Sequence, residues 1–129
     1  IYMGTPMPVD INELVAAARS RIREVEPGDC LAGEALVVDV REPAEFAQGH
    51  LPGAVNLPRG VLEFQIRAHP AIAGRTTGSS ALPLLLYCLT GGRSALAADS
   101  LGQLGFEDVR SLAGGLQAWR NAGLPVSME

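Results

Sequence analysis

One cysteine stands where two sequence patterns meet. Cys88 follows an apolar run at residues 84–87 and precedes a glycine-containing segment, after which alanines and leucines recur at helical spacing. The run predicts a strand buried on both faces, and the spacing predicts a helix. Cys88 is therefore expected at the carboxyl end of a strand and just before a helix, where open α/β sheets place their ligands.

The residues after Cys88 are suited to hold negative charge on its sulfur. They are Leu89, Thr90, Gly91, Gly92, Arg93 and Ser94. The two glycines can adopt positive φ, so that backbone N–H groups converge, and the helix start adds free N–H groups. Arg93 adds a positive charge, and such surroundings lower the pKa of a cysteine from about 8.5 to about 3.5–7.5. We predict that Cys88 is a reactive thiolate and not merely a small buried apolar residue.

Two charged residues, and the hydroxyl of Ser94, are also expected near this sulfur. Asp39 and Arg41 stand at the carboxyl end of a β-rich apolar run at residues 35–40, which predicts a central strand. This end belongs to the same sheet edge as Cys88. The Asp39 carboxylate could hold loop N–H groups or pair with Arg41. Ser94 is placed either to cap the helix or to hydrogen-bond the sulfur.

Strands that alternate with helices are expected to position these residues. Besides the two strands above, strands are predicted at residues 54–57 and 108–112. Helices are predicted at residues 11–24, 43–48, 61–68 and about 95–104, with a last one after residues 114–115. Trp119 on the last helix should cover core. The alternation predicts an α/β domain with a parallel sheet covered on both faces.

Two other residues could take part in cysteine chemistry. His50 could act as a general base for Cys88. A thiolate that is already stabilised by N–H groups and Arg93 needs no base, so we expect a structural role for His50. Cys30 falls beside a predicted turn at residues 27–30. It is either a resolving cysteine or, as we expect, a passive thiol. Two cysteines are too few for a disulfide framework, which favours a reducing compartment.

Composition limits the classes of partner. The chain has 129 residues, of which 47% are hydrophobic and 5% aromatic, enough for one domain with an aliphatic core. Ten basic against fourteen acidic residues give a net charge of −4 and argue against nucleic-acid binding. The sequence has neither a membrane-length apolar stretch nor a signal-peptide pattern at its start. We expect a soluble, cytoplasmic protein without a membrane or nucleic-acid partner.

Three segments in order resemble the rhodanese-homology domain. Cys88, Gly91, Arg93 and Ser94 match the pattern of its active-site loop. The runs DVREPAEF at residues 39–46 and GHLPGAVNLP at residues 49–58 resemble its upstream signature, and GGLQAW at residues 114–119 resembles its carboxyl-terminal one. With the intervening spacing, the resemblance covers most of the chain from about residue 9 to residue 126.

The resemblance implies both a fold and a reaction. The fold is a single rhodanese-like domain at residues 9–126, with a central, mainly parallel sheet of about five strands, after a flexible segment at residues 1–8. The reaction is sulfur transfer through a persulfide on Cys88, from a small anionic donor, thiosulfate or a persulfide, to a thiol, a protein acceptor or cyanide. Asp39 and Arg41 would have supporting roles, and His50 would belong to a turn. No metal or organic cofactor is implied.

Two rival functions belong to the same fold. Phosphatases and arsenate reductases of this fold usually have five residues between the cysteine and the arginine, whereas this loop has four, Leu89 to Gly92. Regulatory modules that have lost catalysis commonly lack the cysteine, which is present here. Thiosulfate-preferring members often have additional basic residues in the loop. Leu89 and Thr90 are neutral in this loop. A persulfide is therefore a candidate donor as well as thiosulfate.

Overall fold

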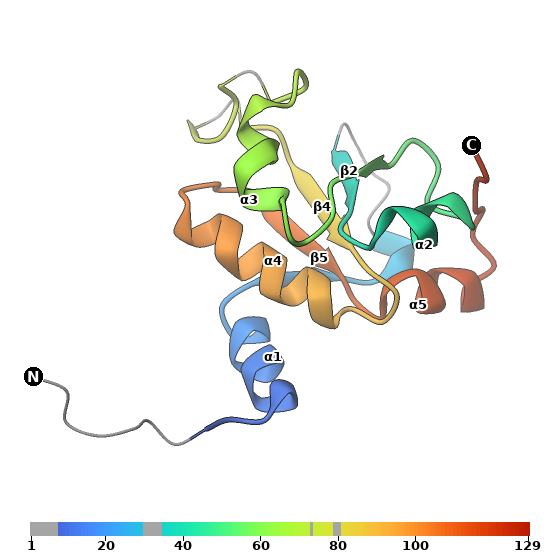
Figure 1. Ribbon diagram of the computed structural model, residues 1–129, viewed down its shortest axis with the longest axis horizontal. Helices are drawn as coiled ribbons and strands as arrows, with labels where there is room; N and C mark the ends of the chain where they lie inside the picture. Colours follow the sequence, from blue (N-terminus) through green and yellow to red (C-terminus); the bar gives the residue numbers. More distant parts are fainter. Residues whose placement is uncertain (1–7, 30–34, 73, 79–80) are drawn as a thin grey trace, which may run out of the picture.

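The computed structural model describes residues 8–29, 35–72, 74–78 and 81–129, in which five strands form one parallel sheet (Figure 1). The strands are β1 (Arg23–Val25), β2 (Leu36–Asp39), β3 (Val55–Asn56), β4 (Leu84–Tyr87) and β5 (Val109–Leu112). Their order in the sheet is β1-β5-β4-β2-β3, and every neighbouring pair is parallel. The predicted α/β fold with a parallel sheet of about five strands is confirmed. The strand that precedes Cys88, β4, is central.

Helices precede, connect and follow the strands. They are α1 (Ile11–Arg19), α2 (Pro43–Ala47), α3 (Leu62–Gln65), α4 (Gly92–Gln103) and α5 (Gly115–Asn121), with the 3-10 turns η1 (Pro27–Asp29) and η2 (Ile66–Ala68). Glu13 in the first turn of α1 accepts a hydrogen bond from the backbone N–H of Asp10. Glu45 does the same for the N–H of Glu42 at the start of α2. None of the helices in the described ranges has the length and apolar character needed to cross a membrane.

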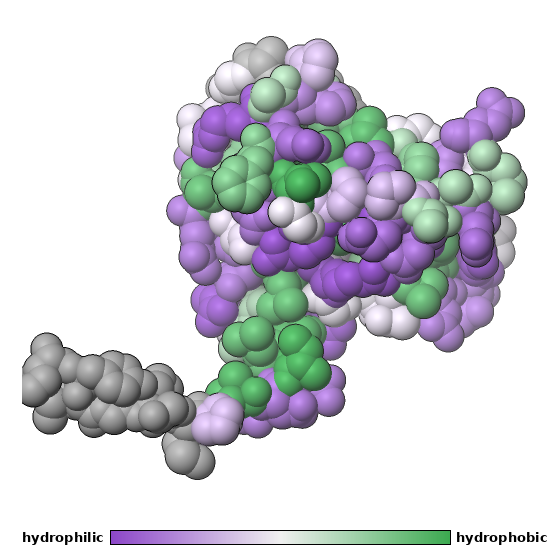
Figure 2. All heavy atoms as spheres, in the orientation of Figure 1, coloured by the Kyte–Doolittle hydropathy of each residue, from purple (hydrophilic) through white to green (hydrophobic). Residues whose placement is uncertain are grey.

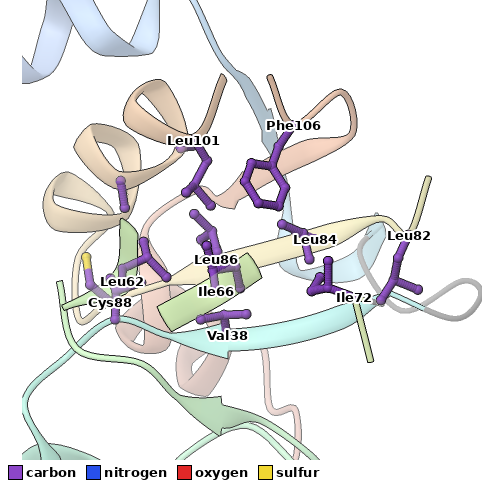
Figure 3. Close-up of a cluster of buried hydrophobic side chains, with 13 residues drawn as sticks. Val38, Leu62, Ile66, Ile72, Leu82, Leu84, Leu86, Cys88, Leu101 and Phe106 are labelled. Carbon is purple, nitrogen blue, oxygen red and sulfur yellow. The ribbon is translucent and has the colours of Figure 1, made fainter. Parts of the chain in front are cut away.

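Apolar side chains on both faces of β4 hold the sheet between two layers. Side chains alternate along a strand, so Leu84 and Leu86 face one way and Leu85 and Tyr87 the other. The first pair joins a cluster that includes residues of α3, η2 and α4, and α3 and α4 lie over this near side of the sheet (Figures 1 and 3). The second pair joins a cluster that contains Trp119 of α5. Helices therefore cover both faces, and Trp119 is core as expected.

The predicted first helix is too long. We expected it to span residues 11–24, but α1 ends at Arg19, and Arg23–Val25 forms β1. This strand pairs with β5, with Glu24 opposite Ser111. Arginine and glutamate favour helices locally, but the N–H and C=O groups along the open side of β5 need partners. Pairing between distant segments therefore overrides local propensity here.

Other boundaries also differ from the sequence pattern. The predicted strands at residues 35–40 and 54–57 shorten to β2 and β3, and the helix at residues 61–68 divides into α3 and η2. That helical segment ends at His69, whose backbone is extended at φ −66° and ψ 133° because Pro70 follows. The helix after Cys88 begins earlier than predicted, at Gly92. Cys30 lies outside the described residues.

Exposed apolar side chains gather over α1 (Figure 2). Val9 and Ile11 are each 58% exposed and Leu14 is 46% exposed, whereas Ala18 is fully buried. The helix therefore contributes to the core through one narrow face.

Candidate active site

Cys88 lies at the carboxyl end of β4 and is only 1% exposed. Its side chain occupies one end of the first apolar cluster (Figure 3). Asp39 is opposite Tyr87 in the register of β2 and β4. The sheet thus brings Asp39 to the same edge as Cys88, as predicted from the two strands.

The loop after Cys88 directs a backbone N–H at the sulfur. The N–H of Gly91 donates to Cys88 Sγ over 3.1 Å. Gly91 has φ +103°, which glycine adopts without the steric penalty of a Cβ. Gly92 does not share this conformation, because it begins α4. Of the two loop glycines that could adopt positive φ, only Gly91 does so, and it is the residue that holds the sulfur.

Two serines connect the sulfur to β5. Ser94 lies in the first turn of α4, and Gly91, not Ser94, is the cap residue. The Ser94 hydroxyl is 2.8 Å from the Ser111 hydroxyl and donates to the Gly91 carbonyl over 3.3 Å. The Cys88 thiol donates to Ser94 Oγ over 3.7 Å. Ser94 therefore contacts the sulfur rather than capping the helix. Sequence reasoning missed Ser111, although a serine in a buried strand was a usable signal.

The start of α5 binds the carbonyl groups of the same loop. The N–H of Leu116 donates to the Cys88 carbonyl over 2.9 Å, and that of Gln117 donates to the Leu89 carbonyl over 3.0 Å. Gly115 has φ +60°, and a Cβ on it would lie 2.5 Å from the Cys88 carbonyl oxygen. The predicted close turn at Gly114 and Gly115 is confirmed. It serves a purpose that the sequence did not indicate, since it brings α5 against the Cys88 loop.

Arg93 is paired with a carboxylate from α2. Its Nη1 is 2.8 Å from Glu45 Oε1, and its Nη2 is 3.1 Å from Glu45 Oε2. The hydrogen bonds from Arg93 lower the pKa of Glu45 to about 2. The pKa of Arg93 is raised, first by Glu45 and to a smaller degree by Cys88. The charge of Arg93 therefore acts on Cys88, but Glu45 offsets much of it.

Asp39 and Arg41 form a buried ion pair. Their side chains are 0% and 5% exposed, and Arg41 Nη2 is 2.7 Å from Asp39 Oδ2. Asp39 also accepts the backbone N–H of Arg41 over 2.8 Å, and Arg41 donates to the Gly49 carbonyl over 2.7 Å. The guanidinium lies over the Tyr87 ring, and burial raises the pKa of Tyr87. Asp39 therefore meets both expectations, because it pairs with the Arg41 guanidinium and also accepts a backbone N–H of the loop that follows β2.

His50 has structural partners on both ring nitrogens. Nδ1 is 2.9 Å from the Leu51 carbonyl, and Nε2 is 2.9 Å from the Glu129 carbonyl. The ring stacks on Phe46 with centroids 3.9 Å apart. Within the described ranges no hydrogen bond joins His50 to Cys88. Its contacts agree with a structural role.

Two cavities flank the Cys88 loop. One, of about 210 Å³, lies between α2 and α5, and Glu45, Leu89, Leu116 and Arg120 are among its lining residues. The other, of about 350 Å³, lies between α1 and α4, and Arg19, Thr90 and Arg93 are among its lining residues. Arg93 lines one cavity and its partner Glu45 lines the other. The ion pair therefore stands between the two.

A larger cavity of about 580 Å³ lies away from this loop, between β1 and the later part of α4. Arg21, Asp99 and Phe106 are among its lining residues, whereas residues 88–94 do not line it. Its size therefore does not mark the reactive centre. In the part of the chain that the structure describes, no three His, Cys, Asp or Glu side chains are grouped as metal ligands.

Comparisons with known proteins identify the family of this chain. Residues 28–122 match the family model of the rhodanese-like domain. A sulfurtransferase from Allochromatium vinosum is 36% identical over 93 residues, which cover 72% of this chain and 78% of that protein. The chloroplastic thiosulfate sulfurtransferase 16 from Arabidopsis thaliana is 36% identical over 110 residues, covering 76% and 84%.

A solved structure from Rhodopseudomonas palustris is also similar, with a TM-score of 0.78 and 30% sequence identity. The alignment covers 98% of this chain and 100% of that one. That protein is described as being of unknown function and as a possible tyrosine phosphatase.

Proposed function

The chain belongs to the rhodanese-like family, and from this premise we propose that it is a sulfurtransferase that carries sulfane sulfur as a persulfide on Cys88. The observation that carries the proposal is the 3.1 Å hydrogen bond from the Gly91 N–H to a sulfur that is 1% exposed. A fixed N–H dipole aimed at a buried sulfur stabilises negative charge there without reorganisation. Both the thiolate and its persulfide carry such charge.

In the loading step, the Cys88 thiolate attacks the outer sulfur of the donor. With thiosulfate, a new sulfur–sulfur bond forms, the bond to the sulfonate breaks, and its electron pair leaves with sulfite. With a persulfide donor, the leaving group is a thiolate. The first N–H groups of α4 lack partners within the helix, and we expect them to bind the transferred sulfur.

In the second step, a nucleophile removes the outer sulfur. A thiolate or cyanide attacks it, the bond to Cys88 breaks, and the electron pair returns to Sγ as thiolate. Each step exchanges one bond to sulfur for another, so that no external oxidant is needed. The Ser94 hydroxyl contacts the sulfur and is hydrogen-bonded in turn to the Ser111 hydroxyl.

A thiocyanate assay tests this proposal. Wild-type protein should form thiocyanate from cyanide with thiosulfate or with a small persulfide as the donor. Cys88→Ser should be inactive because its hydroxyl stays protonated, whereas Cys30→Ser should retain most of the activity. Equal loss in both variants would give Cys30 a part in transfer, and substantial activity of Cys88→Ser would refute the mechanism.

The Rhodopseudomonas palustris structure gives a reason to test a phosphatase as a second candidate. The present loop has four residues between Cys88 and Arg93. We expect this loop to hold one sulfur atom and to place a phosphoryl group too far out for in-line attack, because orientation supplies about 7–11 kcal/mol of such barriers. Turnover of an aryl phosphate at the rate seen with thiosulfate, lost on Cys88→Ser, would favour the phosphatase.

A third possibility is a binding module without turnover. It would be favoured if Cys88 acquired sulfur but no thiol or cyanide removed it. Single-turnover release from the loaded protein therefore separates a module of this kind from a transferase.

A further inference from the structure

The cavity between α2 and α5 adjoins the Cys88 loop. Leu89 and Leu116 line it, and the N–H of Leu116 binds the Cys88 carbonyl. Glu45 and Gln48 line it from α2, and Arg120 from α5. Its volume of about 210 Å³ equals the share of about seven water molecules in liquid water. The space suits a ligand about the size of an amino acid.

Some of the charged side chains that line this cavity have ion-pair partners within the described part of the chain, and one does not. Arg41 is committed to Asp39 and to the Gly49 carbonyl, and Glu45 is committed to Arg93. Among the described residues, the Arg120 side chain has no hydrogen-bond or ion-pair partner. The uncompensated charge in the cavity is therefore the positive charge of Arg120, which favours an anionic ligand.

The guanidinium of Arg120 rests against the backbone of Gly49. A Cβ on Gly49 would lie 2.9 Å from Arg120 Nη2. The absence of a side chain at Gly49 thus leaves room for the cation on the cavity wall. A single guanidinium on the wall of this cavity matches one carboxylate, whose two oxygens fit the donor fork of arginine.

Arg120 belongs to a later turn of α5 than the residues that touch the Cys88 loop. Arg120 is five residues beyond Gly115, which touches the loop carbonyls, so its Cα lies about 7.5 Å farther along the helix axis. The sulfonate of thiosulfate is bonded directly to the sulfur that it donates and would stay near the loop. A carboxylate joined to its sulfur by a short carbon chain can extend toward Arg120 while Leu89 and Leu116 contact the methylene groups.

We propose that this cavity binds a small carboxylate-bearing thiol and its persulfide, with Arg120 as the residue that anchors the carboxylate. The inference rests on the sulfur transfer proposed above. The thiolate attacks the outer sulfur of the Cys88 persulfide, the bond to Sγ breaks, and the products are the small persulfide and the Cys88 thiolate. The reverse reaction loads Cys88 from the same persulfide, with the same bonds exchanged.

Binding of inert analogues tests the site without sulfur chemistry. Calorimetry would compare methylthiopropionate with methylthiopropionamide, which lacks the charge, on the full chain. Wild type should prefer the acid, and Arg120→Ala should weaken acid binding about fivefold while leaving the amide unchanged. Arg67→Ala is the matched control, because Arg67 is an exposed cation that binds the Leu104 carbonyl over 2.8 Å, outside this cavity.

Kinetics of the loaded enzyme test the consequence for transfer. Arg120→Ala should raise the KM for mercaptopropionate about fivefold with kcat unchanged, and should leave mercaptopropionamide and cyanide unaffected. Arg120→Lys should restore part of the preference for the acid. Equal losses for acid and amide would make Arg120 merely structural, and a wild type that binds both analogues alike would overturn the site. If Cys88 took up no sulfur, the proposed transfer would fail, while calorimetry would still decide whether Arg120 binds the carboxylate.

Discussion

The Cys88 loop and the Asp39–Arg41 pair lie at the same edge of the sheet but are built from different groups. At Cys88, backbone N–H groups and glycines position the sulfur, and Gly91 donates to it directly. At Asp39, two opposite side-chain charges satisfy each other while buried. The first arrangement leaves a charge-stabilising dipole aimed at a nucleophile. The second leaves nothing unsatisfied and serves as a scaffold.

The difference indicates where substitutions will act. A side-chain ion pair can be broken by removing one partner, and the remaining charge then destabilises the whole fold. A backbone N–H survives every side-chain replacement except proline, so the glycines that permit the path of the Cys88 loop are the positions at which substitution disturbs it most. Variants of the pair should therefore affect folding, and variants of the glycines should affect sulfur chemistry beyond their effect on folding.

The largest effect on stability is expected for Asp39→Ala. Arg41 would remain buried without its partner, which costs about 3–5 kcal/mol of the free energy of unfolding. Denaturant unfolding measures this cost. Asp99→Ala breaks a pair with the same residue types, but the Arg21 side chain there is 55% exposed, and little change is expected. Equal losses in both variants would contradict the scaffold assignment.

Gly115→Ala should be the next largest change. A left-handed conformation costs a non-glycine residue about 1–2 kcal/mol, and the new Cβ would also lie 2.5 Å from the Cys88 carbonyl oxygen. Gly123→Ala is the matched control, because Gly123 has φ +77° with nothing within 4 Å of its Cβ position. Both variants should lose stability in denaturant unfolding, but only Gly115→Ala should lose most of its sulfur transfer. A fully active Gly115→Ala would show that α5 does not position the loop.

Glu45→Gln should have the smallest effect on stability, because both partners of the Arg93 pair are more than a third exposed. The lowered pKa of Glu45 means that its stabilisation is fully present above pH 4.5 and is lost as the pH falls toward about 2. The difference in unfolding free energy between wild type and variant should shrink over this range. A constant difference down to pH 2 would contradict the ion-pair explanation.

The same variant should change the choice of donor. Releasing Arg93 from Glu45 leaves an uncompensated cation beside the loop, which should favour the doubly charged thiosulfate by about two- to fivefold over a small persulfide. Ratios of kcat/KM for the two donors measure this preference. An unchanged ratio would mean that backbone N–H groups alone select the donor.

Local patterns predicted the centre of the site better than its surroundings. The strand, loop and helix around Cys88 were readable because an apolar run and a helical spacing meet within a few residues. The partner of Arg93 was not, because Glu45 is 48 residues away and only the fold brings the two together. β1 was missed for a similar reason, since its three residues form a strand only through pairing with β5.

The central claim is that Cys88 carries the sulfur. Intact mass before and after exposure to thiosulfate or a small persulfide, followed by peptide mapping under non-reducing conditions, tests it most directly. We expect the added mass of one sulfur atom on the peptide that contains Cys88, lost on treatment with cyanide and absent from Cys88→Ser. A wild-type protein that gains no sulfur from either donor, or equal uptake of sulfur by Cys88→Ser, would contradict persulfide formation on Cys88.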